Sequence, residues 1–158
     1  MPRSNQSVPS AAPARPGVVV RIVLDTNVVV SALVWGGTPF KLIEAAVAGD
    51  LALCTSPALL AELRAVLTRE HLASRLEGQR ASVEEVVALY AALAISVSPT
   101  APPRVVPGDA DDDEVIAAAI AANADLLVTG DRDLLALGSY QKIRIITPAE
   151  AVRLLDAP

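Results

Sequence analysis

Two aspartates of this 158-residue chain each follow an apolar run that has the character of a β-strand. Asp25 comes directly after residues 18–24, and Asp131 comes after residues 126–129 and one glycine. Because a carboxylate is costly to bury, a buried strand that ends in one is typical of a chain that delivers the carboxylate to a site. If the two strands are parallel neighbours, their ends lie about 4.8 Å apart and both acids reach the same edge of the sheet.

Purely structural roles compete with this interpretation. Asp25 could belong to a plain turn, Asp131 could only cap the helix that follows it, and Asp133 suits the positive end of that helix. Capping does not explain why two strands end in the same way. We therefore take Asp25 and Asp131 as candidate site residues, with Asn27 and Thr129 as candidate hydrogen-bonding groups beside them.

A run of acidic residues, five of the six at positions 109–114, supplies a further candidate. Negative charge is favourable at a helix N-terminus, which accounts for most of the run. Asp113 differs because the residues three, four and seven positions later are apolar, so that it begins the inward stripe of a helix. Asp112 has apolar residues four and seven positions later and is the competing candidate. A calcium loop is excluded because Glu114 and Ile120 stand where glycine and glutamate are required.

Glu62 is a candidate because its helical neighbours are apolar. The residues three and four positions before and after it are alanine, leucine or valine. A carboxylate on such a stripe is costly unless it is paired or bound to a metal. A position at the border of the stripe, or an ion pair with a nearby arginine, is the competing explanation.

Together these residues predict a carboxylate cluster at one edge of the sheet, formed by Asp25, Glu62, Asp113 and Asp131. Two carboxylates about 4 Å apart repel each other by about 4 kcal/mol at an effective dielectric constant near 20, so the cluster calls for a cation. Ligands that offer only oxygen suit Mg²⁺ or Mn²⁺. Such an ion binds a phosphodiester and activates a water for in-line attack, which indicates phosphodiester hydrolysis.

Composition excludes several other chemistries. The only cysteine, Cys54, lies in an apolar run and is interpreted as a core residue, and the only histidine, His71, is interpreted as a surface or capping residue. No disulfide framework, thiolate metal cluster, or Ser–His or Cys–His couple follows from them. The net charge of −5 argues against a broad nucleic-acid-binding surface, but not against a site where a metal meets phosphate.

The chain is expected to form one domain, residues 18–158, after a disordered tail. Residues 1–17 are rich in proline, serine and alanine and lack the apolar middle of a secretion signal. No apolar run approaches the roughly 20 residues that a membrane span requires. The expected location is the cytoplasm.

The expected strands and helices alternate along the whole domain. The strands are expected at residues 18–24, 51–55, 95–99, 125–129 and 143–147, and the helices at residues 28–34, 40–49, 56–70, 81–94, 111–123, 131–137 and 148–155. Thr38, Ser56 and Ser82 are the expected N-caps of three of these helices. The alternation predicts an α/β fold, a three-layer α/β/α sandwich around a parallel sheet of about five strands.

Four segments of the chain resemble the PIN-domain family, in particular the toxin-type (VapC-like) ribonucleases of bacterial toxin–antitoxin pairs. They are VLDTNVVVSALVWGG (23–37), TSPALLAELRAVLTR (55–69), DADDDEVIAAAIAANADLLVTGDRDLLAL (109–137) and IRIITPAEAV (143–152). The Asp-Thr-Asn after the first strand and the Thr-Gly-Asp-x-Asp-Leu block are fairly specific in this order. The tail up to Gly17 is not part of the pattern.

The resemblance implies a five-stranded parallel sheet and a metal-dependent endoribonuclease that cleaves single-stranded RNA. The acids of the family match Asp25, Glu62, Asp113 and Asp131, with Asp133 also possible for the last, and its Ser/Thr and Asn match Asn27 and Thr129. The resemblance also implies a homodimer or higher homo-oligomer and a small antitoxin partner. Arg64, Arg69, Arg75 and Arg80 could guide RNA phosphates or meet an acidic antitoxin tail, although solvated helix arginines are the competing interpretation.

Two alternatives belong to other classes of protein. A phosphoacceptor receiver domain needs paired acids after its first strand and a lysine after its last, whereas here Asp25 stands alone and Lys142 precedes the last strand. A binding module that keeps the PIN fold without catalysis would match the same sequence pattern. Metal-dependent cleavage of single-stranded RNA distinguishes the ribonuclease from both.

Overall fold

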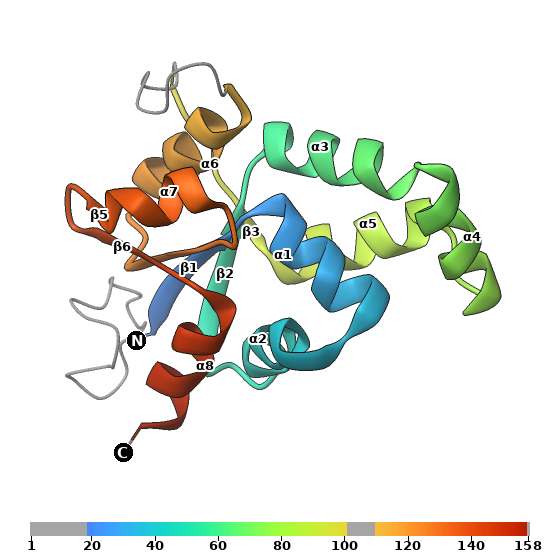
Figure 1. The fold of residues 1–158 in the computed structure, drawn as a ribbon, viewed down its shortest axis with the longest axis horizontal. Helices are drawn as coiled ribbons and strands as arrows, with labels where there is room; N and C mark the ends of the chain where they lie inside the picture. Colours follow the sequence, from blue (N-terminus) through green and yellow to red (C-terminus); the bar gives the residue numbers. More distant parts are fainter. Residues whose placement is uncertain (1–18, 101–109, 158) are drawn as a thin grey trace, which may run out of the picture.

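The computed structural model describes residues 19–100 and 110–157. The expected N-terminal tail, residues 1–17, and most of the proline-rich connector before the acidic run lie outside the described residues. Within the described ranges, strands are interspersed with helices around one central sheet, as the sequence predicts (Figure 1).

The sheet has six strands in the order β3-β2-β1-β4-β6-β5. The strands are β1 (Val20–Leu24), β2 (Leu51–Thr55), β3 (Ile95–Ser96), β4 (Leu126–Val128), β5 (Ser139–Tyr140) and β6 (Ile143–Ile146). All neighbouring strands are parallel except β5, which pairs antiparallel with β6. The predicted five-strand parallel sheet is therefore present, extended by one short antiparallel edge strand.

The strand order reverses between β1 and β4. The chain moves outward from β1 through β2 to β3 and then returns to the other side of β1 to form β4. In the register of this pair, Leu24 lies opposite Val128, so that both strands end at the same level. In open α/β sheets such a switch point leaves a crevice beyond the carboxyl ends of the two strands, which is where ligands bind.

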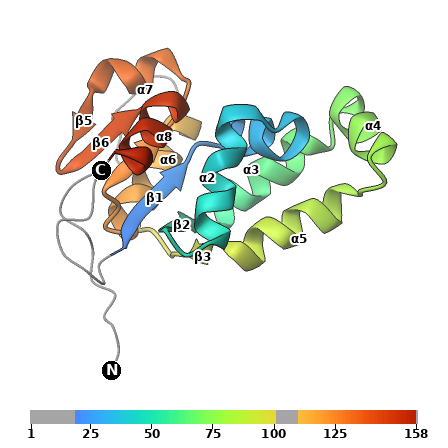
Figure 2. The ribbon, with the colours of Figure 1, turned by 90° about the horizontal axis from the view of Figure 1, so that it is seen from below.

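Helices cover both faces of the sheet (Figures 1 and 2). They are α1 (Thr26–Val30), its continuation as a π-helical turn η1 (Ser31–Trp35), α2 (Gly37–Val47), α3 (Pro57–Leu67), α4 (Glu70–Gly78), α5 (Val83–Leu93), α6 (Ala110–Ala121), α7 (Arg132–Leu137) and α8 (Pro148–Asp156). In both views α3, α4 and α5 extend away from the strands.

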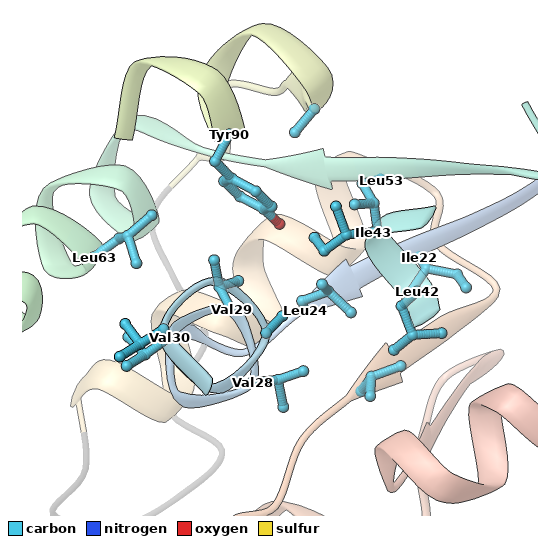
Figure 3. Packing of buried hydrophobic residues seen from close by; sticks show 14 of the residues in the cluster. Ile22, Leu24, Val28, Val29, Val30, Leu42, Ile43, Leu53, Leu63 and Tyr90 are labelled. Carbon is cyan, nitrogen blue, oxygen red and sulfur yellow. The ribbon is translucent and has the colours of Figure 1, made fainter. Parts of the chain in front are cut away.

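Alternate residues of the strands feed two hydrophobic cores. Ile22 and Leu24 of β1 belong to the larger core, together with buried residues of α1, η1, α2, α3, α4, α5 and α8. Val23, on the opposite face, belongs to the smaller core with α6 and α7. Figure 3 shows the larger core, where Leu24 lies near Val29 of α1. Burial on both faces explains why these strands are solidly apolar in sequence.

The helix caps predicted from sequence are confirmed except for one. The Ser56 hydroxyl accepts a hydrogen bond from the Leu59 amide (3.3 Å), and Ser82 forms a capping box with Glu85. The prediction for Thr38 is wrong, because α2 begins earlier, after Gly36 with φ +79°. Only glycine adopts such a φ without strain, so the turn itself sets the start of this helix.

Two elements of the structure were not predicted. α4 follows α3 after a short break, and its only buried residues are Leu72 and Leu76. Two apolar residues in one polar segment give a weak helical signal. The other is β5, which has two residues and is tied to β6 through a turn with Gln141 at φ +55°.

Within the described residues no single helix is long and apolar enough to cross a membrane. The segment Thr26–Trp35 and the helix Gly37–Val47 meet the length and composition test only as a pair, and they are bent by 94° at the break between them. Both supply buried residues to the larger core, such as Val28 and Leu42.

Replacing Tyr90 with phenylalanine is expected to stabilise the fold. Tyr90 is 3% exposed, and among the described residues its hydroxyl has no hydrogen-bond partner. Burial raises the pKa of this phenol well above its ordinary value, with the Cys54 thiol as a smaller cause. Removing a buried, unsatisfied hydroxyl should raise the free energy of unfolding by about 1 kcal/mol.

Urea denaturation checks this expectation, with Tyr140→Phe on the half-buried edge strand β5 as the matched control. Tyr140→Phe should leave the stability unchanged. A loss of stability in Tyr90→Phe would mean that the hydroxyl is satisfied in solution.

Candidate active site

Asp25 stands at the carboxyl end of the central strand β1 and is 7% exposed. Its backbone amide donates to the Val128 carbonyl of β4 (2.9 Å), so the β1–β4 pairing extends to the acid itself. Its carboxylate caps α1 by accepting from the Thr26 amide (2.8 Å) and also accepts from the Thr129 hydroxyl (2.7 Å). The side chain is thus fixed by contacts from both strand ends.

Glu62 is joined to this site through a threonine. The Thr26 hydroxyl donates to the Glu62 carboxylate (2.7 Å), which connects the start of α1 to the middle of α3. Thr26 is buried, and Glu62 is partly exposed. The glutamate on the apolar stripe of α3 is therefore turned toward Asp25 rather than simply reaching solvent from a border position.

Thr129 connects the two strand ends. It is fully buried, its hydroxyl donates to Asp25, and its oxygen accepts from the Asp131 amide (2.9 Å). Asp131 in turn caps α7 by accepting from the amides of Asp133 (2.8 Å) and Leu134 (3.1 Å). Asp131 therefore both caps α7 and is linked to Asp25 through Thr129, so its structural role and its role as a candidate site residue do not exclude each other.

A group of three carboxylates lies at this edge of the sheet. One carboxylate oxygen from each of Asp112, Asp131 and Asp133 lies within 4.8 Å of the other two. Asp112 is buried, Asp131 partly exposed and Asp133 exposed, so the group runs from the interior to the surface. Asp131 belongs both to this group and to the hydrogen-bonded chain that leads to Asp25 and Glu62.

Asp112 and Asp113 are both buried at the start of α6, at 5% and 7% exposed. The helix after them is buried nearly all round, including five consecutive residues from Val115 to Ala119. An apolar stripe that wide cannot distinguish one aspartate from the next. The sequence ranking of Asp113 ahead of Asp112 therefore stays a prediction, while the carboxylate group includes Asp112.

The remaining sequence candidates occupy different positions. Asn27 is exposed in the first turn of α1. Thr26 was not singled out by the sequence reasoning, although its place directly after Asp25 at the start of a helix was a usable signal. Cys54 is buried, and burial raises the pKa of its thiol, which makes it a poor nucleophile, as its interpretation as a core residue requires. His71 is exposed on α4.

Replacing Thr129 with valine is expected to weaken both the fold and the site. Valine keeps the shape but removes the hydroxyl that serves Asp25 and the Asp131 amide. Leaving buried polar groups unsatisfied should cost about 1–3 kcal/mol in the free energy of unfolding. Where a carboxylate binds a metal ion, as the sequence predicts for Asp25 and Asp131, loss of the group that orients it typically lowers activity by roughly 10- to 100-fold.

Urea denaturation measures the effect on stability, and an assay of the single-stranded RNA cleavage expected from the sequence measures the effect on activity. Thr129→Ser restores a hydroxyl at the same position and should recover most of the activity. If Thr129→Val were as active as the unmodified chain, the threonine would have no positioning role.

The donor set of this edge fits a hard divalent cation. The three grouped side chains offer carboxylate oxygen only, and a close approach of three carboxylates is unfavourable without a cation. Oxygen ligands favour Mg²⁺ or Mn²⁺ over zinc, which prefers nitrogen and sulfur. The residues present are thus suited to the metal that the sequence predicts.

The fold and this edge define a class: a mostly parallel α/β sheet with acidic side chains gathered at its topological switch point. A family model described as PIN domain matches residues 21–133, which spans every element from β1 to the start of α7. The chain belongs to the PIN-domain family. This membership favours the PIN prediction over the receiver-domain alternative.

Two individual proteins are similar to the chain. The chain is 27% identical over 144 residues to the uncharacterized protein MJ1680 of Methanocaldococcus jannaschii, covering 85% of this chain and 91% of that protein. It also resembles a chain in the crystal structure of VapBC2 from Rickettsia felis bound to a DNA fragment from their promoter, with a TM-score of 0.53 and 18% identity, covering 81% of this chain and 98% of that one. At this identity the second likeness supports the fold.

Proposed function

We propose that the protein is a metal-dependent endoribonuclease that cleaves single-stranded RNA. The observation that carries the proposal is the meeting, at the β1–β4 switch point, of acids from distant parts of the chain. Asp25 and Glu62 are linked through Thr26, Asp25 is linked to Asp131 through Thr129, and Asp131 lies with Asp112 and Asp133. An acidic, partly open edge without a nucleophilic histidine or cysteine suits metal-assisted hydrolysis.

Asp112, Asp131 and Asp133 would hold the ion, with Asp25 close by through Thr129. When bound, Mg²⁺ or Mn²⁺ would supply charge neutralisation for the phosphate and a water of lowered pKa. Thr26 and Thr129 keep the carboxylates in place by donating hydrogen bonds to Glu62 and Asp25. The Thr129–Asp25 contact is buried and the Thr26–Glu62 contact is partly buried, so reduced access of water strengthens both hydrogen bonds.

The biological role proposed is that of the toxin in a toxin–antitoxin pair, acting in the cytoplasm. PIN-domain membership and the fold likeness to VapBC2 support it. On this proposal a small antitoxin and a second copy of the chain are the protein partners, and RNA is the substrate. A non-catalytic PIN-fold binding module is the remaining alternative, and the same assay decides between them.

Removing the metal is expected to abolish cleavage. A labelled single-stranded RNA should be cut by the purified chain in Mg²⁺ or Mn²⁺, remain intact with excess EDTA, and be cut again when the metal is restored. Asp25→Asn should be inactive under all three conditions, whereas Asp50→Asn, at an exposed position before β2, should behave as the unmodified chain. Cleavage that persists in EDTA would contradict the proposal, and RNA binding without any cleavage would favour the binding module.

A further inference from the structure

An open hollow lies where α4 meets the end of η1, away from the sheet. Its volume is about 570 Å³. The residues that line it are Trp35, His71, Ser74, Arg75, Gly78 and Gln79. The Gln79 side chain donates to the Val34 carbonyl (3.2 Å), which ties the end of α4 to η1 and fixes the two walls relative to each other.

One wall of the hollow is an exposed tryptophan. Trp35 is the only tryptophan of a chain with 3% aromatic residues, and it is 58% exposed. The Arg75 guanidinium carbon lies 4.0 Å from the centre of its ring. A large exposed ring with a guanidinium over one of its faces combines the two groups that hold bases and phosphates in single-stranded nucleic acid complexes.

The other wall is one face of α4. His71, Ser74, Arg75 and Gly78 follow helical spacing and present an imidazole, a hydroxyl and a guanidinium. Neither glutamate of this helix, Glu70 or Glu77, lines the hollow. In a chain of net charge −5 the hollow therefore combines cationic and hydrogen-bonding groups without a carboxylate. Its chemistry matches a ligand that is anionic and carries a flat π-face.

The hollow is connected to the candidate active site by a single helical segment. The segment Thr26–Trp35 begins directly after Asp25, its N-cap, and ends at the tryptophan. At 1.5 Å per residue these ten positions span roughly 15 Å. A strand held at one end by the acidic edge would need only a few nucleotides to reach the other.

We propose that this hollow is a subsite for one nucleotide of single-stranded RNA, with the base stacked on Trp35 and its phosphate held by Arg75. The proposal rests on the proposed ribonuclease function. It adds a second place, outside the acidic edge, where the RNA strand is bound. Binding at the hollow needs no metal, whereas cleavage does, so the two proposals can be tested separately.

The tryptophan provides a direct measurement. Since Trp35 is the only tryptophan, its fluorescence reports on the hollow alone. In EDTA, titration with a ten-nucleotide single-stranded RNA should quench this fluorescence to saturation. Removing one stacking or phosphate contact should weaken binding by roughly tenfold. Arg75→Ala should also reduce the salt dependence of the dissociation constant by about one unit of slope.

Gly78 allows the hollow to be filled without disturbing the fold. A Cβ built at this position meets nothing within 4 Å, and the backbone is not in the left-handed region. Gly78→Leu should therefore fold normally and weaken RNA binding as Arg75→Ala does. Arg153→Ala, which removes an exposed arginine of α8, is the matched control and should leave binding unchanged.

The cleavage assay adds an independent comparison. On a long RNA, Arg75→Ala and Gly78→Leu should raise KM several-fold and leave kcat unchanged. The proposal is overturned if RNA does not quench Trp35, or if both variants bind RNA like Arg153→Ala. It is also overturned if Gly78→Leu changes only the oligomeric state or the binding of a protein partner. Quenching without any cleavage in Mg²⁺ would instead count against the ribonuclease function and leave the subsite intact.

Discussion

The Asp131→Asn variant is expected to lose RNA cleavage by roughly 10³-fold while its fold stays intact. Asp131 belongs both to the carboxylate group and to the hydrogen-bonded chain that leads to Asp25. Replacing its charge with an amide removes a ligand of the proposed ion and part of the negative field that attracts it.

Stability should be nearly unaffected because asparagine caps helices as well as aspartate does. The Oδ1 atom of asparagine can accept from the amides of Asp133 and Leu134, as the carboxylate does. Thermal denaturation of the variant should therefore overlay that of the unmodified chain. Asp131→Ala separates the two roles, since it should lose about 1 kcal/mol of stability together with the activity. An Asp131→Asn variant with normal cleavage would remove Asp131 from the site.

Asp112→Asn is expected to lower cleavage and Mn²⁺ affinity by about 10²-fold, and Asp113→Asn by far less. Both residues are buried at the start of α6, so burial alone does not separate them. Only Asp112 belongs to the group of oxygen atoms around Asp131 and Asp133.

The pair is its own matched control, because the substitution, the helix position and the degree of burial are nearly the same. Calorimetric titration with Mn²⁺ and the rate of RNA cleavage should give the same order of effects. The reverse order, with Asp113→Asn the inactive variant, would support the ranking drawn from sequence and place the ion on the other side of the helix start.

The two strand-end aspartates could be predicted from the sequence, whereas the pairing of their strands could not. Asp25 and Asp131 stand out because a strand ends at each, and this signal needs no knowledge of the partner strand. The sequence does not predict that β1 and β4 are neighbours, because pairing between segments about a hundred residues apart produces no pattern within either segment. The structure supplies that pairing, and with it the Asp25–Thr129 contact.

Helix α6 shows where periodicity fails. Helical periodicity identifies the inward face only when a helix has one apolar and one polar face. This helix is packed on nearly all sides in the smaller core, with Ala118 and Ala119 fully buried. When every position is apolar, the phase of the stripe is undefined. The sequence pattern of this helix therefore does not decide between Asp112 and Asp113.

The short elements could not be predicted from the sequence for a different reason. β5 has two residues and is held mainly by its pairing with β6, so its sequence carries no strand pattern. η1 and α4 meet through Gln79, a contact between residues 45 positions apart in sequence. The hollow beside Trp35 lies where these two segments meet, so neither segment predicts it from its own sequence.

The pairing of β1 with β4 has a consequence for when the protein becomes active during its synthesis. Asp25 is translated early, but the Thr129 hydroxyl that holds it lies 104 residues later in the chain. Contacts between residues so far apart in sequence form late, because the entropic cost of closing a long loop precedes the stabilisation that the contacts provide. A nascent chain that has not yet released β4 from the ribosome therefore holds an unassembled centre. The enzyme proposed here would become competent only after β4 has left the ribosome and paired with β1.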